Sequence, residues 1–251
     1  MAWIDLNADL GETVAGVPTA DDEAMFAVIS SASIACGGHA GDAASLAVAV
    51  DRAARFGVAI GAHPSYPDPA NFGRIPRAML PAELTAAVAE QLAALVDAGG
   101  DVRYVKPHGA LYHAVTADAA HADAVAAAVA DLAARLGRPV AVLGLPGRIE
   151  RSARAAGLPF VREAFLDRGY RPDGSLVPRG EPGALLHDPD EVAARAVRLV
   201  REGVVEALGG MLVPAEAASL CLHGDSPDAV AMARAVRAAL ESDGIVVRAP
   251  W

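Results

Sequence analysis

The chain has 251 residues, a formal net charge of −10, and 53% hydrophobic but only 4% aromatic residues. An acidic surface argues against nucleic acid or an anionic membrane as a partner, because neither attracts negative charge. The length suits one domain spanning residues 1–251, and α/β barrels reach this size as a single unit. With so few aromatic residues, the core is expected to consist of Ala, Val and Leu.

The first residues show no signal-peptide pattern, and no apolar run is long enough to span a bilayer. A cytoplasmic location is therefore expected. The two cysteines, Cys36 and Cys221, lack the spacing of a disulfide-rich framework and are predicted to be free thiols.

In chain order, short apolar runs alternate with alanine-rich helical stretches. Strands are predicted over residues 4–7, 33–36, 58–62, 103–107, 140–143, 160–164, 219–222 and 245–247. Thr19 and Asp22 have the spacing of a capping box, and Pro81 marks a helix start. Helices are expected to end in left-handed glycines at three positions, namely Gly57, Gly99 and Gly137.

This alternation of strands and helices predicts a parallel sheet, either a closed barrel or an open doubly wound sheet. An open nucleotide-binding sheet usually carries a glycine-rich phosphate loop after an early strand. Neither GxGxxG nor GxxxxGK[ST] occurs in the chain. We therefore expect a single-domain parallel β/α barrel.

The polar residues gather directly after the predicted strands. They occur in the segments DLNADLGE, CGGHAGD, GAHPSYPD, VKPHGALY, REAFLDRGY and CLHGD. In a barrel the carboxyl ends of all strands share one face, so these segments are expected to surround a common cavity. Four of the seven histidines lie in them, namely His39, His63, His108 and His223, and His113 directly follows the VKPHGALY segment.

Spacing within these segments indicates which side chains share a direction. Asp5, Asn7 and Asp9 are two residues apart, so in an extended strand they point to one side. Lys106 and His108 repeat that spacing on another strand.

Structural roles are the alternative reading of several carboxylates. Asp5 or Asp9 could serve a turn or a helix cap. For Asp42 and Asp188, which precede predicted helices, capping is the favoured interpretation.

Lys106 is the single lysine of a chain with twenty arginines. An ammonium group is compact and changes its protonation readily when buried, whereas guanidinium is a wide fork that stays charged. Lys106 is therefore a candidate for a role that arginine cannot fill. The alternative is a compositional bias against lysine that spared one position by chance.

The segments DLNADLGE, CGGHAGD, GAHPSYPD with NFGR, VKPHGALY, DRGYRPDGSLVPR and CLHGD resemble the signature segments of the LamB/YcsF family, in order and over almost the whole chain. The resemblance implies a seven-stranded β/α barrel akin to sugar-deacetylase barrels. It also implies ATP-dependent opening of the 5-oxoproline lactam to L-glutamate, together with two partner subunits, B and C. The family often has CGFHAGD at the second segment, so Gly38 replaces a bulky ring beside His39.

Lactam hydrolysis needs an activated water, stabilisation of the oxyanion and protonation of the leaving nitrogen. We assign these roles to six predicted catalytic residues. Either Asp9 or Glu12 is the general base, with His39 or His63 orienting it. Lys106 with His108 is the oxyanion stabiliser or the acid for the nitrogen.

Substrate binding is expected from a second set of residues. Arg168, and also Arg74, offer the two-pronged guanidinium that suits a carboxylate, although a salt bridge is the alternative for either one. The remaining predicted substrate contacts are Asn7, Asp167 and His223. Because the chain has no phosphate loop, the ATP consumed by the complex is expected to bind to the partner subunits.

A divalent metal is a further possibility, because Asp and two His side chains from separate strand ends can hold Zn²⁺ with one position left for water. Two other functional classes remain open. One is a metal-dependent deacetylase-like hydrolase that acts alone. The other is a noncatalytic binding subunit.

Overall fold

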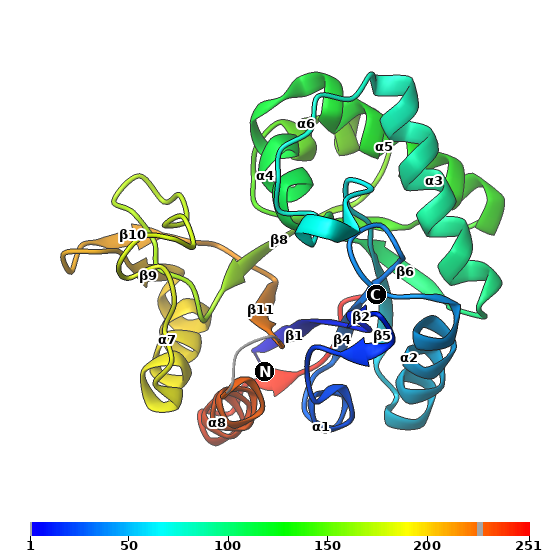
Figure 1. Cartoon of the computed structure of the whole chain (residues 1–251). Coiled ribbons are helices and arrows are strands. Elements are labelled where there is room, and N and C mark those ends of the chain that lie inside the picture. Colours follow the sequence, from blue (N-terminus) through cyan, green and yellow to red (C-terminus); the bar gives the residue numbers. More distant parts are fainter. Residues whose placement is uncertain (1, 225–227) are drawn as a thin grey trace. The chain divides into compact units, whose positions relative to one another are not determined.

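The computed structural model describes residues 2–224 and 228–251 (Figure 1). Its main sheet has eight strands in the order β11-β8-β7-β6-β5-β4-β1-β12, and β11 pairs with β1 as well. Because β11 pairs with both β8 and β1, seven strands form a closed ring, and β12 adds to β1. This confirms the predicted seven-stranded barrel.

All the predicted strands are present, with small shifts at their ends. They are β1 (Trp3–Leu10), β4 (Ser31–Ala35), β5 (Ala59–His63), β6 (Val102–Val105), β7 (Ala141–Gly144), β8 (Phe160–Phe165), β11 (Ser219–His223) and β12 (Val246–Val247). The β5–β6 and β6–β7 pairings are parallel. The carboxyl ends of these three strands therefore lie at one edge, which places the side chains that follow them near one another.

Contacts divide the chain into two compact units, each built from segments far apart in sequence. The first unit comprises the chain up to Ala8, Ala20–Ser31 and Glu163–Pro250. The second comprises Asp9–Thr19, Ala32–Arg162 and Trp251. Organisation of residues 1–251 as a single domain stays a prediction.

The second unit contains most of the helices. They are α2 (Ala43–Phe56), α3 (Pro81–Asp97), α4 (Gly109–Ala117), α5 (Ala119–Leu136) and α6 (Arg148–Ala155), with a short 3₁₀ turn η1 (Pro69–Asn71). Asp42 caps α2 by accepting from the Ser45 amide at 2.8 Å, as expected. Gly57 and Gly137 end α2 and α5 in the left-handed conformation. The unit also contains a hairpin, β2 (Thr13–Val14) and β3 (Val17–Pro18), that was not predicted.

The first unit contains α1 (Asp22–Phe26), α7 (Pro189–Glu202), α8 (Ala229–Ser242) and a second unpredicted hairpin, β9 (Val204–Glu206) with β10 (Leu212–Pro214). Asp188 caps α7 by accepting from the Asp190 amide at 2.9 Å. The capping box predicted at Thr19 is wrong. Asp21 caps α1 instead, by accepting from the Ala24 amide at 3.1 Å.

The buried side chains are mostly Ala, Val and Leu, as the composition predicts. Among the larger rings, Tyr104 stacks on Trp251 in the second unit with centroids 4.5 Å apart. Cys36 and Cys221 are buried free thiols. Among the described residues, no helix combines the length and apolar character needed to cross a membrane.

Candidate active site

Polar side chains from four strand ends form one connected cluster in the second unit. Asp9 belongs to β1 and Glu12 follows it, while the other members follow or end β4, β5 and β6. None of them exposes more than 7% of its surface. The cluster consists of the six residues predicted to be catalytic: Asp9, Glu12, His39, His63, Lys106 and His108.

Asp9 joins the lysine to the histidines. The Nζ atom of Lys106 donates to Oδ1 of Asp9 at 2.8 Å, and Oδ2 of Asp9 lies 3.4 Å from Nε2 of His63. The single lysine of the chain is therefore a fully buried ion-pair partner rather than a surface residue. Its compact ammonium occupies a space that the wider guanidinium of arginine does not match.

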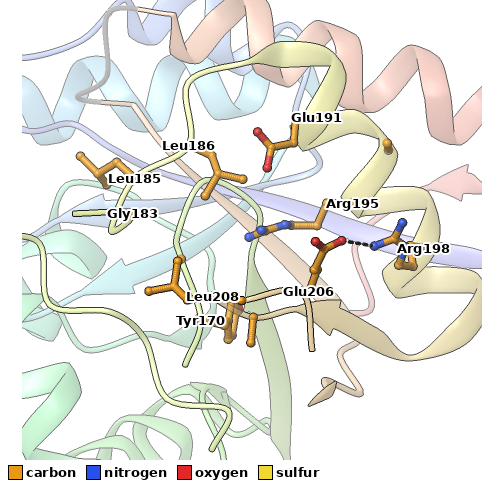
Figure 2. A pocket seen from close by; sticks show the side chains of 14 residues that line it. Tyr170, Gly183, Leu185, Leu186, Glu191, Arg195, Arg198, Glu206 and Leu208 are labelled. Carbon is orange, nitrogen blue, oxygen red and sulfur yellow. Dashed lines mark hydrogen bonds and ion pairs between the residues drawn. The ribbon is translucent and has the colours of Figure 1, made fainter. Parts of the chain in front are cut away.

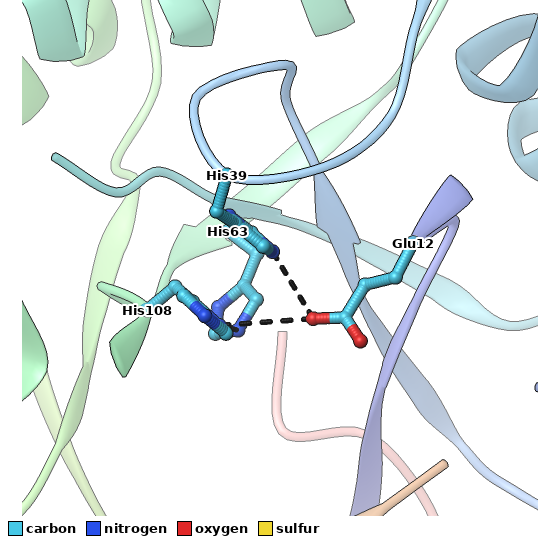
Figure 3. Close-up of side chains that lie close together, drawn as sticks. All are labelled: Glu12, His39, His63 and His108. Carbon is cyan, nitrogen blue, oxygen red and sulfur yellow. Dashed lines mark hydrogen bonds and ion pairs between the residues drawn. The ribbon is translucent and has the colours of Figure 1, made fainter. Parts of the chain in front are cut away.

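Glu12 joins the other two histidines, as Figure 3 shows. Its Oε1 atom lies 3.0 Å from Nε2 of His39 and 3.7 Å from Nδ1 of His108. The rings of His39 and His108 stack with centroids 3.6 Å apart and planes inclined by 2°. His63 meets His108 edge-on. The three imidazoles thus contact one another, and the rings of His63 and His108 are held by backbone carbonyls as well.

Two backbone carbonyls determine the tautomers of His63 and His108. Nδ1 of His63 lies 2.7 Å from the Lys106 carbonyl, and Nε2 of His108 lies 2.9 Å from the Phe72 carbonyl. A carbonyl only accepts, so each of these nitrogens carries a proton. Burial lowers the pKa of His39 and lowers the pKa of His108 well below its ordinary value, which favours neutral rings.

The segment NFGR, which begins at the last residue of η1, packs against the histidines. Phe72 and Gly73 both have positive φ angles, 53° and 63°. A Cβ atom on Gly73 would lie 2.9 Å from Cβ of His39, so only glycine fits there. The Phe72 ring meets His39 edge-on at 5.2 Å. Phe72 was not predicted as a site residue, because a left-handed phenylalanine has no sequence signal.

Gln91, from α3, occupies the space beside Gly38. Its side-chain amide accepts from the Ser65 amide at 3.0 Å and donates to the Ser65 carbonyl at 2.9 Å. A Cβ atom on Gly38 would lie 2.2 Å from Oε1 of Gln91. The absence of a ring at position 38 therefore leaves no gap, because Gln91 fills this side of the His39 loop.

The two predicted carboxylate-binding arginines have different surroundings. Arg74 is exposed, with its guanidinium 4.8 Å from the centre of the Phe72 ring. Arg168 is buried in the first unit and donates from Nε to the Ala184 carbonyl and from Nη2 to the Val177 carbonyl. These bonds hold the segment that follows β8. Contact of either arginine with a substrate carboxylate stays a prediction.

The other predicted substrate contacts lie in the first unit. Asp167 accepts from the His223 amide at 3.0 Å and lies 2.9 Å from its Nδ1. Burial opposes ionisation of Asp167, but His223 outweighs it and lowers the pKa of the carboxyl. Asn7 donates to Oγ of Ser219 at 2.7 Å. Asp225, from the CLHGD segment, is outside the described residues.

Asp5 serves neither a turn nor a helix cap. It is fully buried in the first unit and accepts from the hydroxyls of Ser30 and Ser31 at 2.7 Å each and from Ser219 at 2.5 Å. Burial raises the pKa of Asp5 to about 6 although these three hydrogen bonds act in the opposite direction. The hydrogen bond from Ser219 links β1 to β11, which indicates a structural role for the Asp5 carboxyl.

The first unit also has a surface cavity of about 380 Å³, which Figure 2 shows. Its walls combine leucines with charged residues from α7 and the β9–β10 hairpin. Arg198 pairs with Glu206 across 3.0 Å, and Arg195 donates to the Arg168 carbonyl. None of the predicted site residues lines this cavity.

The comparisons with known proteins agree with this architecture. Residues 4–250 match the LamB/YcsF family. The A subunit of 5-oxoprolinase from Streptomyces griseus subsp. griseus is 53% identical over 98% of this chain and 99% of its own length. The corresponding 5-oxoprolinase A subunit of Paracidovorax citrulli is 50% identical over 98% of each chain.

A solved structure is also similar over nearly its full length. The lactam utilization protein from Thermus thermophilus has a TM-score of 0.90 and 44% identity, covering 98% of this chain and 99% of that one. Family, relatives and fold all point the same way: this chain belongs to the LamB/YcsF family.

Proposed function

We propose that this chain is the A subunit of an ATP-dependent 5-oxoprolinase, which opens the 5-oxoproline lactam to L-glutamate. Relatives with 53% and 50% identity over 98% of the chain are named as A subunits of 5-oxoprolinase. The observation that carries the proposal is the buried cluster, where two carboxylates, one lysine and three histidines lie in a connected network. Such a concentration of buried ionisable groups is typical of a catalytic site.

The groups in the cluster match the needs of amide hydrolysis. Water adds to the lactam carbonyl carbon, the ring C–N bond breaks, and the nitrogen takes up a proton to become the amino group of glutamate. Asp9 or Glu12 takes the proton from the water. Lys106, already held by Asp9 at 2.8 Å, places a positive charge where the oxyanion develops. The proton for the leaving nitrogen comes either from Lys106 or from His108, which is the N-cap residue of α4.

ATP use is proposed for the assembled complex and not for this chain alone. The sequence has no phosphate-binding loop of the usual kinds. The relatives are named as subunits, which also supports an assembly with partners. We therefore assign nucleotide binding and the phosphoryl step to the B and C subunits.

The direct test is to assay conversion of 5-oxoproline to glutamate with ATP, using this chain alone and together with its B and C partners. Turnover is expected only in the complete mixture. Full ATP-dependent turnover by the isolated chain would contradict the division of labour. Hydrolysis of an acetylated sugar by the isolated chain without ATP would instead support the deacetylase-like alternative.

A further inference from the structure

The ring nitrogens of His63 and His108 that face each other both present lone pairs. Nε2 of His63 lies 3.0 Å from Nδ1 of His108. The opposite nitrogen of each ring carries its proton towards a carbonyl, at 2.7 Å from Lys106 and 2.9 Å from Phe72. A neutral imidazole has only one N–H, so neither facing nitrogen has a proton to donate. Two lone pairs at this distance repel unless a positive species lies between or beside them.

One carboxylate oxygen lies near each of these two facing nitrogens. Nδ1 of His108 lies 3.7 Å from Oε1 of Glu12, and Nε2 of His63 lies 3.4 Å from Oδ2 of Asp9. The positive species is therefore either an added proton, which makes one ring an imidazolium, or a metal ion. A proton bonds to one nitrogen of the pair, whereas a metal ion accepts lone pairs from both imidazoles and from a carboxylate at once.

The spacing of these atoms suits metal coordination. Bonds of about 2.0–2.1 Å in a tetrahedral zinc site place neighbouring ligand atoms roughly 3.3 Å apart. The observed separations are 3.0 Å between the two histidine nitrogens and 3.7 Å from His108 to Glu12. One ligand atom each from Glu12, His39, His63 and His108 lies within 4.8 Å of the others. Small adjustments of the side chains would thus complete a site.

We propose that His63 Nε2, His108 Nδ1 and Glu12 Oε1 bind one divalent transition-metal ion of the zinc type. Two imidazoles and one carboxylate favour such an ion over Mg²⁺, which prefers oxygen ligands. Lys106 offsets the charge of Asp9, and Glu12 contributes one negative charge against the two positive charges of the ion. The carbonyls of Lys106 and Phe72 hold the ligand rings in the required tautomer, as outer partners of metal ligands commonly do.

The proposed site gives the remaining residues distinct roles. His39 donates to Glu12 across 3.0 Å and orients it. With Glu12 and His108 bound to the ion, Asp9 is the carboxylate that remains as general base, and Lys106 rather than His108 is the acid that remains for the leaving nitrogen. This last assignment rests on the proposed function, whereas metal binding does not and is measured without substrate.

The test is calorimetric titration of the full chain with Zn²⁺ after treatment with a chelator, and in parallel with Mg²⁺. We expect one equivalent of Zn²⁺ to bind and no comparable binding of Mg²⁺. Replacement by Co²⁺ should give the visible absorption of a site with nitrogen ligands. Absence of stoichiometric Zn²⁺ binding would overturn the proposal, as would ring ¹⁵N spectra that show an imidazolium between His63 and His108 in the presence of Zn²⁺.

Variants locate the site. Loss of an outer partner of a metal ligand typically weakens binding about 10- to 100-fold, so His39→Ala is expected in that range and Glu12→Gln or His108→Ala beyond it. His113→Ala is the matched control, because His113 is exposed on the neighbouring helix α4. Circular dichroism identifies any variant that does not fold, and Glu12→Gln keeps the size of the side chain. Wild-type affinity in folded Glu12→Gln and His108→Ala would place the ion elsewhere and contradict the assignment.

Discussion

The Nζ atom of Lys106 donates to Oδ1 of Asp9 at 2.8 Å, and neither residue exposes more than 6% of its surface. Desolvating two such charges costs several kcal/mol per ion, which their attraction repays only partly. A buried pair of this kind is therefore weak evidence for stability. Its position among three histidines and a second carboxylate indicates that it serves the chemistry of the site.

Lys106→Arg is expected to lower turnover of the reconstituted complex by roughly 10²- to 10⁴-fold, the usual effect of losing a positioned acid, base or oxyanion donor. The charge is kept, but the wider guanidinium cannot occupy the same space and does not release its proton. The control is Arg103→Lys on β6, since Arg103 pairs with Asp101 at the surface. Turnover near the wild-type rate in a folded Lys106→Arg variant would end the catalytic interpretation of this lysine.

Asp9→Asn and Lys106→Met should each destabilise the chain by about 3–5 kcal/mol, because each leaves one buried charge without its partner. The double variant removes both charges, so its loss should be smaller than the sum of the two single losses. Urea denaturation of the four proteins gives the coupling free energy. Additive losses would show that the two groups do not interact in the folded protein.

Asp5 is expected to make stability depend on pH. Its pKa is raised by burial from 3.8 to about 6, so the folded state holds the proton more tightly than the unfolded state. The contribution to the free energy of unfolding is complete below about pH 3.8 and is lost as the pH rises through about 6. The difference between these values corresponds to roughly 3 kcal/mol.

The check is urea denaturation of wild type and Asp5→Asn at several values between pH 4 and pH 7. Asparagine does not titrate, so the stability of the variant relative to wild type should rise across this range. Because all other groups are common to both proteins, their contributions cancel. A constant difference would show that Asp5 has an ordinary pKa in the folded state.

Gly38→Ala is expected to destabilise the chain by about 1–3 kcal/mol, the usual cost of overpacking. The added Cβ would lie 2.2 Å from Oε1 of Gln91 and 2.5 Å from Oγ of Ser65, so the bonds between Gln91 and Ser65 must rearrange. Gly180→Ala is the control, because nothing lies within 4 Å of a Cβ there. Equal melting temperatures for the two variants would show that the loop around Gly38 and His39 accommodates the added methyl group without loss of stability.

The strands were predictable because each is a short apolar run bounded by Gly, Pro or polar residues. The limits of β1 and β6 moved by only a few residues. The hairpins β2–β3 and β9–β10 were missed because strands of two or three residues show no alternation of apolar and polar side chains. The cap of α1 was misplaced because Thr19, Asp21 and Asp22 all qualify as N-caps by residue type.

The membership of the cluster was also predictable, since residues that follow parallel strands meet at one edge. The contacts within it were not. The tautomers of His63 and His108 depend on the carbonyls of Lys106 and Phe72. The position of a backbone carbonyl cannot be inferred from the type of residue that carries it. The serines around Asp5 come from two segments far from it in the sequence, so only the folded chain brings them together.

The most direct test of the account is the rate of glutamate formation from 5-oxoproline and ATP by the complex of this chain with its B and C partners, measured with wild type, Asp9→Asn and Glu12→Gln. Both substitutions keep the size of the side chain and remove a carboxylate from the buried cluster. We expect each to lower the rate by about 10²-fold or more while the complex still assembles. Wild-type rates from both variants in an intact complex would contradict the claim that this cluster opens the lactam.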